Sequence, residues 1–184
     1  MRRHLLALLA ALLVVAGGAG VAVANAPVRL ETSGPTEVTG TEASAVFTIA
    51  DRTIRQVRYH DKQVLTYSFA LRNDGSIPVT VTGLRPLERE PRLFRYVDLV
   101  DEEGAERFAV PAGGSTRVAL RMRMHSCETL SARAGSFASE VALATTRAGF
   151  LDGSVVLTLP EEVHTGSPRE AFCPGATAGS RSPG

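Results

Sequence analysis

Apolar and polar residues alternate with a period of two along much of the chain. In residues 63–73, QVLTYSFALRN, the apolar side chains that share one face are Leu65, Tyr67, Phe69 and Leu71. This alternation is typical of a β-strand with one buried face. It predicts seven strands, near residues 44–50, 63–72, 78–84, 92–99, 116–124, 136–147 and 153–159, and a short edge piece within 52–60.

The segments between these strands are rich in glycine and proline. The sequences NDGS at Asn73–Ser76 and PAGGS at Pro111–Ser115 are turn signals. No segment after residue 26 shows the 3.6-residue period of an amphipathic helix. Short strands separated by such turns predict an all-β fold: an immunoglobulin-like antiparallel β-sandwich of about seven strands over residues 43–160.

The N-terminal 26 residues differ from the rest of the chain. Arg2 and Arg3 precede an apolar run from Leu5 to Ala24, which ends in small residues suited to signal-peptide cleavage. The run exceeds the roughly 7–15 apolar residues of most signal peptides and approaches the roughly 20 that span a bilayer. Residues 1–26 are therefore predicted to be a hydrophobic helix, either a cleaved signal peptide or a transmembrane anchor. Both alternatives place the remainder outside the cytoplasm, secreted or anchored to the cytoplasmic membrane.

Two polar stretches flank the predicted sandwich. Residues 27–42 are rich in Pro, Gly and Thr and are predicted to be a linker, and residues 161–184 a C-terminal tail. The chain has two cysteines, Cys127 and Cys173. An even pair in an exported protein is typical of a disulfide, which here would tie part of the tail to the sandwich.

Two stretches resemble bacterial immunoglobulin-like sandwich modules. They are YSFALRNDGSIPVTVTGL at 67–84 and VPAGGSTRVALRM at 110–122, each of which combines a glycine turn with a β-branched strand. The resemblance covers roughly Ala43–Pro160, and the layout is also similar to small exported actinobacterial proteins of unassigned function. It implies a sandwich architecture and no particular activity.

The sequence contains no nucleophile elbow, HExxH motif or phosphate-binding glycine loop. We therefore predict a protein that is not an enzyme and needs no cofactor. An acidic cluster is interpreted as a solvated turn, with calcium binding as the alternative; its members are Asp98, Asp101, Glu102 and Glu103. His60 and His164 are predicted to be exposed loop residues.

The stretch RMRMHSCETL at 121–130 contains the ligand types of an extracytoplasmic copper site, Met122, Met124 and His125, to which His60 could be added. In a strand, however, residues two apart share a face. Met122 and Met124 then continue the apolar face of Val118 and are predicted to be core residues. Copper binding therefore stays the alternative function.

The same alternation places Arg117, Arg121, Arg123 and His125 on the opposite, solvent-facing side. We predict that these four residues contact an anionic partner, such as an envelope polymer, lipid headgroups or an acidic protein surface. The whole chain has a formal net charge of only +1, so nothing indicates nucleic-acid binding. The predicted function is a non-catalytic structural or interaction module at the cell envelope, which recognises its partner through strand faces and loops.

Overall fold

Ten β-strands make up the part of the chain that the computed structural model describes, which comprises residues 27–42, 44–126 and 135–165. The strands are β1 (Leu30–Thr39), β2 (Ser44–Ile49), β3 (Arg52–Val57), β4 (Val64–Asn73), β5 (Val79–Arg85), β6 (Phe94–Asp101), β7 (Phe108–Val110), β8 (Ser115–Met124), β9 (Ser136–Arg147) and β10 (Leu151–Thr165). Each of the seven predicted strands corresponds to one of them. The predicted edge piece corresponds to β3, whereas β1 and β7 were not expected.

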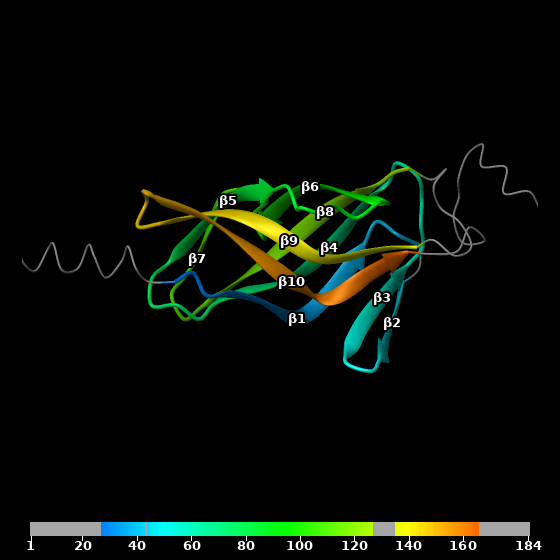
Figure 1. Cartoon of the computed structure of the whole chain (residues 1–184), viewed down its shortest axis with the longest axis horizontal. Helices are drawn as coiled ribbons and strands as arrows, with labels where there is room; N and C mark the ends of the chain where they lie inside the picture. Colours follow the sequence, from blue (N-terminus) through cyan, green and yellow to red (C-terminus); the bar gives the residue numbers. More distant parts are fainter. Residues whose placement is uncertain (1–26, 43, 127–134, 166–184) are drawn as a thin grey trace, which may run out of the picture.

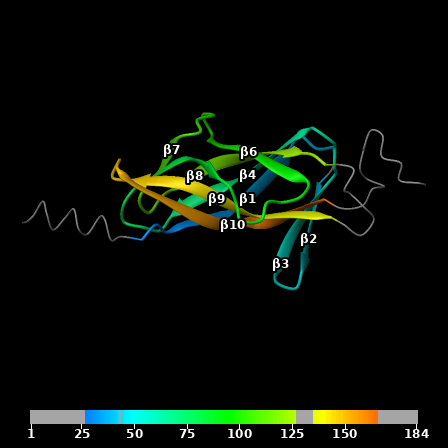
Figure 2. The ribbon, with the colours of Figure 1, turned by 45° about the horizontal axis from the view of Figure 1, so that its top comes forward.

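The strands form two sheets that pack face to face. Sheet A has the order β1-β4-β8-β6, and sheet B has the order β2-β3-β10-β9-β5-β7. Neighbouring strands are antiparallel, except that β3 runs parallel to β10. Figures 1 and 2 show an elongated sandwich from which the β2–β3 hairpin projects on one side. The predicted all-β sandwich is confirmed at this level.

Two predicted boundaries are wrong in the described residues. Most of the predicted linker, residues 27–42, is strand β1, which pairs with β4. Its Gly34-Pro35 pair had suggested a linker, but Pro35 lies where the β1–β4 register shifts between Ser33 and Glu37. A proline is tolerated at such an irregularity in an edge strand, because no ladder hydrogen bond needs its missing N–H. The predicted tail likewise begins five residues too early, since β10 continues to Thr165.

The core lies between the sheets and follows the predicted alternation. The inner face of β4 carries four side chains that are 0% exposed: Leu65, Tyr67, Phe69 and Leu71. The neighbouring strand β8 extends this layer with Val118, Leu120, Met122 and Met124, of which none is more than 1% exposed. Sheet B covers this layer with residues such as Val81, Val141, Leu143 and Val163. Period-two patterning thus decides which side of each strand is buried.

A buried polar cluster joins the two sheets along the side where β1 approaches β10. Glu161 of β10 is 9% exposed, and Nε of Arg55 in β3 donates to its Oε2 at 2.5 Å. The hydroxyl of Thr36 in β1 donates to Oε1 of the same carboxylate at 2.8 Å and accepts a hydrogen bond from Arg55. The Tyr67 hydroxyl of β4 donates to Oε2 at 3.4 Å. One carboxylate therefore connects four strands of both sheets.

Glu161 belongs to the inward face of β10, because burial alternates without interruption through Leu157, Leu159, Glu161 and Val163. A register break lies beside it: opposite β9, Thr158 pairs with Glu140 and Val163 pairs with Ala138, so four residues of β10 face a single residue of β9. An excess of residues on one strand bends that strand. Burial and the nearby charge of Glu161 raise the pKa of Tyr67, which therefore keeps its proton and donates to the carboxylate.

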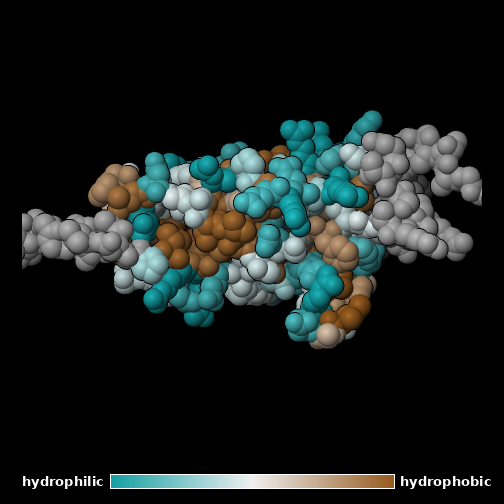
Figure 3. Space-filling view, in the orientation of Figure 1, coloured by the Kyte–Doolittle hydropathy of each residue, from teal (hydrophilic) through white to brown (hydrophobic). Residues whose placement is uncertain are grey.

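Three of the four sheet edges carry features that discourage pairing with another strand. β1 contains Pro35 and a register shift, β6 contains a register shift between Tyr96 and Asp98, and β7 has only three residues. β2 differs, because SAVFTI has no charge, no proline and no register shift, and all six residues are exposed. Figure 3 shows apolar surface on this projecting hairpin, to which Val46, Phe47 and Ile49 contribute. β2 is therefore the unprotected edge of the sandwich.

The first and last described residues lie at opposite ends of the long axis, as the blue start of β1 and the orange end of β10 show (Figure 1). Within 27–42, 44–126 and 135–165, no helix has the length and apolar character needed to cross a bilayer. The predicted N-terminal helix of residues 1–26 and the predicted disulfide between Cys127 and Cys173 lie outside the described residues.

Replacement of Glu161 by Ala should lower the free energy of unfolding by roughly 3–5 kcal/mol, because it leaves the Arg55 guanidinium buried without its partner. Urea unfolding followed by circular dichroism measures the loss. The neighbouring Glu162→Ala variant is the matched control, since Glu162 pairs with Arg52, whose side chain is 52% exposed. That exposed pair should contribute about 1 kcal/mol or less. Equal losses in the two variants would contradict the central role of Glu161.

Candidate functional site

Both methionines of the proposed copper site are core residues. Met122 and Met124 are 0% exposed in the core, and the sulfur of Met124 accepts a hydrogen bond from the backbone N–H of His60 at 3.3 Å. His125 follows the end of β8, where its Nδ1 is 2.6 Å from Oγ of Ser126. In the described part of the chain, no group of three or more His, Cys, Asp or Glu side chains is placed to hold a metal ion.

Two arginines of the predicted contact surface are engaged within the fold. The guanidinium of Arg121 makes two hydrogen bonds to the carboxylate of Asp98, with Nε 2.5 Å from Oδ1. This pairing raises the pKa of Arg121, through hydrogen bonding first and charge second. Nη1 of Arg117 donates to the backbone oxygen of Pro35 at 2.8 Å, and its Nη2 lies 3.6 Å from Glu37. Neither guanidinium is fully available to a partner.

The interpretation of Asp98 as part of a solvated acidic turn is wrong. A register shift between Tyr96 and Asp98 leaves Val97 unpaired and sets Asp98 directly opposite Arg121. Asp98 is consequently 9% exposed. Asp101 does lie at a turn, where its Oδ1 accepts hydrogen bonds from the N–H groups of Glu103 and Ala105. A bulge of this kind has no clear sequence signal, so strand alternation alone could not have paired Asp98 with Arg121.

Arg123 remains without a carboxylate partner among the described residues and faces another arginine. The pairing of β6 with β8 sets Arg95 directly opposite Arg123, and both residues are exposed. Arg95 was not part of the predicted surface, because cross-strand neighbours depend on register. Like charges at directly opposed positions destabilise a sheet. The two guanidinium groups therefore form a locally uncompensated positive site.

A pocket of about 470 Å³ adjoins this site, and His125 and Arg95 both line it. Arg85 adds another cation and Glu90 is the acidic residue in the lining, while Tyr96 contributes an aromatic wall. The Tyr96 hydroxyl donates to the backbone oxygen of Glu140 at 2.6 Å, and burial raises its pKa. This end of the sandwich thus combines a hollow lined by Arg85, Arg95 and His125 with Arg123, which lies opposite Arg95. We call these four residues the Arg95–Arg123 site.

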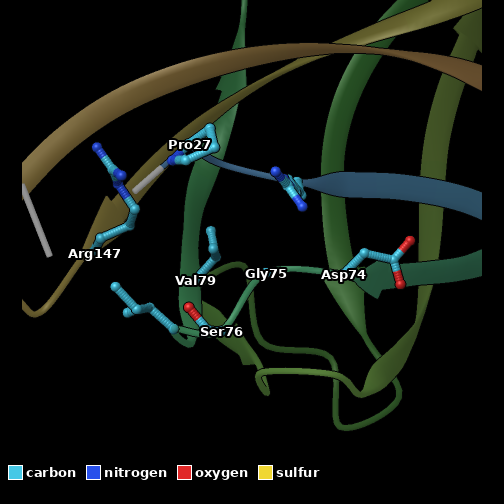
Figure 4. Close-up of a pocket in the computed structure, with 8 residues that line it drawn as sticks. Pro27, Asp74, Gly75, Ser76, Val79 and Arg147 are labelled. Atoms are coloured by element: carbon cyan, nitrogen blue, oxygen red, sulfur yellow. The ribbon is translucent and has the colours of Figure 1, made fainter. Parts of the chain in front are cut away.

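A second, smaller pocket of about 250 Å³ lies at the opposite end of the sandwich, where β1 begins. Figure 4 shows Arg147 and Asp74 on opposite sides of it, with Pro27 between them and Gly75 and Ser76 along its base. Arg29 completes the charged lining. We call this the Arg147 pocket. Sequence patterning did not indicate it, because its residues come from the ends of separate strands.

His164 lies on a strand and not, as predicted, in an exposed loop. It belongs to β10, where its ring stacks on Phe137 of β9 with centroids 4.2 Å apart. Its Nδ1 is hydrogen-bonded to Oε1 of Gln56 in β3. A side chain at Gly135 would place its Cβ 2.4 Å from Nε2 of His164, so this close approach requires glycine. Burial, and then the positive charge of Arg52, lower the pKa of His164.

No family model matches the chain, and no curated protein matches its sequence. Among solved structures, the fold is similar to the cupredoxin domain of amoB from Nitrosocaldus yellowstonii, with 13% sequence identity and a TM-score of 0.28. The match covers 57% of this chain and 60% of that one. A similarity of this size identifies neither a shared function nor a shared ligand.

Met122→Leu should lower the free energy of unfolding by less than about 1.5 kcal/mol, because the two side chains have similar volumes. Met122→Ala should lower it by roughly 2–5 kcal/mol, because it leaves a cavity in the core. Thermal and urea unfolding of both variants measure the difference. A Leu variant as unstable as the Ala variant would instead indicate that the sulfur atom has a role beyond packing.

Acidification should destabilise the wild-type protein more than a His164→Gln variant. The folded state lowers the pKa of His164 below the unfolded value of about 6.5, so folding favours the neutral ring. This contribution is complete above about pH 6.5 and decreases as the pH falls below that value. Urea unfolding at pH 8 and pH 5.5 tests it, and an identical pH dependence in the two proteins would show that His164 is not responsible.

Proposed function

We propose that the chain is an exported or membrane-anchored, non-catalytic interaction module of the cell envelope. It binds an anionic partner at the Arg95–Arg123 site. The N-terminal sequence supports the location, since Arg2 and Arg3 followed by the apolar run to Ala24 are typical of an export signal or an anchor. The absence of catalytic motifs from the sequence supports a binding role.

The strand order supports an immunoglobulin-like domain of the constant type. Constant-type domains have strands A-B-E-D in one sheet and G-F-C in the other. The order β1-β4-β8-β6 and the order β10-β9-β5 reproduce this arrangement in both space and sequence. The β2–β3 hairpin and the short β7 are then additions. Domains of this architecture present sheet faces and loops to their partners, which agrees with a site at one end of sheet A.

The observation that carries the proposal is the direct opposition of Arg95 and Arg123 on the outer face of sheet A. Like charges at directly opposed positions of a sheet repel each other in the isolated protein. An anionic group bound between them would remove the repulsion and gain two attractive interactions. The adjoining pocket, with Arg85 and His125 in its lining, provides room for more than a single charged group.

The predicted contact surface is therefore redefined. Arg123 and His125 keep their proposed roles, and Arg85 and Arg95 join them. Arg121 and Arg117 are assigned to intramolecular pairing, because Asp98 and Glu37 neutralise them. An anionic partner would have to compete with these carboxylates for Arg117 and Arg121, whereas Arg95 and Arg123 are free of such competition among the described residues.

The double variant Arg95→Glu/Arg123→Glu should weaken binding to soluble poly-L-glutamate and to polyphosphate by at least about tenfold at low salt, as expected for losing two close charge pairs. The wild-type affinity should itself fall as ionic strength rises. Fluorescence anisotropy of labelled polymers at several salt concentrations measures both effects.

The matched control is Arg72→Glu/Arg107→Glu, which changes the net charge equally but lies outside the Arg95–Arg123 site. It should retain most of the affinity. Equal losses in the two double variants would mean that net charge, and not this site, determines binding. No binding of either polymer by the wild-type protein would also contradict the proposal.

A further inference from the structure

The Arg147 pocket contains cationic groups that no carboxylate satisfies in the described residues. Nη1 of Arg147 is buried and has no hydrogen-bond partner there. A buried donor without a partner is destabilising, and such groups are rare in folded proteins. Arg29, the other cation in the lining, forms no ion pair with a described residue.

The acidic residue in this lining does not neutralise them. Asp74 is paired with Arg72, whose Nε lies 2.6 Å from its Oδ1. Figure 4 also shows Asp74 on the far side of the pocket from Arg147. The pocket is therefore positive on balance, and an anion beside Arg147 would meet little repulsion from Asp74. Ser76 supplies a hydroxyl from the base of the pocket.

The position of the pocket in the chain restricts what can reach it. Pro27 lines the pocket and is separated from Ala24, the end of the apolar run, by only Asn25 and Ala26. Three residue steps span at most about 10 Å. The headgroup layer on each side of a bilayer is roughly 5–8 Å thick. An anchored chain would therefore hold the Arg147 pocket at or next to the phosphate groups of the lipids.

We propose that the Arg147 pocket is a phosphate-binding site, in which Arg147 and Arg29 bind the phosphate group of an anionic lipid at the membrane surface. Its position at the lipid surface rests on the anchored form of the proposed function, whereas its affinity for phosphate does not. The volume of about 250 Å³ leaves space for the substituents of a phosphodiester beside the phosphate itself.

The first arm of the test uses inorganic phosphate and the full-length protein in a non-ionic detergent. Phosphate at about ten times its Kd should raise the melting temperature by about 3–5 °C over chloride at equal ionic strength. It should also shift the Nε–Hε signal of Arg147 in proton–nitrogen spectra. The rise in melting temperature should disappear in Arg147→Gln. Both effects should weaken in Arg29→Gln, an exposed substitution that does not threaten folding.

The second arm distinguishes a lipid headgroup from free phosphate. The full-length protein is placed in nanodiscs of phosphatidylglycerol or of a phosphate-free glycolipid. The Nε–Hε signal of Arg147 should shift in phosphatidylglycerol nanodiscs and not in glycolipid nanodiscs. Inorganic phosphate added to the phosphatidylglycerol nanodiscs should cause no further shift. A response to inorganic phosphate with identical spectra in both nanodiscs would overturn the assignment to lipid.

Arg107→Gln is the control, because Arg107 is exposed and lines neither pocket. This variant should respond to phosphate as the wild type does. In Arg95→Glu/Arg123→Glu the Arg147 signal should still shift with phosphate, which keeps the outcome independent of the Arg95–Arg123 site. The absence of any phosphate effect on the wild type, or an effect that survives Arg147→Gln, would overturn the proposal.

Discussion

The arrangement of the two sheets depends on the buried Glu161–Arg55 pair of sheet B and on its hydrogen bonds to Thr36 and Tyr67 of sheet A. A sandwich held by apolar contacts alone could slide, because apolar packing is not directional. The carboxylate of Glu161 instead accepts directed hydrogen bonds from β1, β3 and β4, which fixes the approach of β1 to β10. Removing two charges from water is unfavourable, and only this full set of partners offsets it. The hydrogen bond from Thr36 thereby also fixes how β1, and with it the start of the domain, is positioned.

The domain has a cationic site at each end of the sandwich. The Arg147 pocket lies where the described chain begins, and the Arg95–Arg123 site lies where β6 begins and β8 ends. Both are cationic, yet their geometry differs. The first is a partly open pocket with a buried guanidinium nitrogen, whereas the second centres on a pair of exposed arginines on a sheet face. An anchored module of this shape would hold the bilayer at one end and present its second cationic surface away from it. The length of the sandwich, and not a flexible linker, would then set the distance between membrane and partner.

The sequence predicted what depends on local pattern and missed what depends on register. Alternation identified β4 and β8 and the inward direction of Met122, because these strands have one fully buried face. β1 was missed because Pro35 interrupts its pattern, and β7 because three residues show no period. Asp98 and Arg95 acquire their roles from the residues opposite them on β8, and a register irregularity determines the partner of Asp98. Glu161 follows the inward alternation of β10, but it lies beyond the predicted end of the last strand. The Arg147 pocket combines residues from distant parts of the chain, and no short motif could have indicated it. The basic character of the outer face of sheet A was visible in the sequence, but its division into paired and unpaired arginines was not.

The unprotected edge of β2 has a consequence for how copies of the protein coexist. Its six residues carry no charge, so two such edges that meet experience no electrostatic repulsion, and each offers a row of backbone groups to the other. In dilute solution such encounters are brief, since an isolated pair of short strands is only marginally stable. Confinement to a bilayer changes this balance, because neighbours with the same orientation meet at a high effective concentration. The extent of clustering would then depend on the number of copies per membrane area, and it would need no binding site other than the β2 edge.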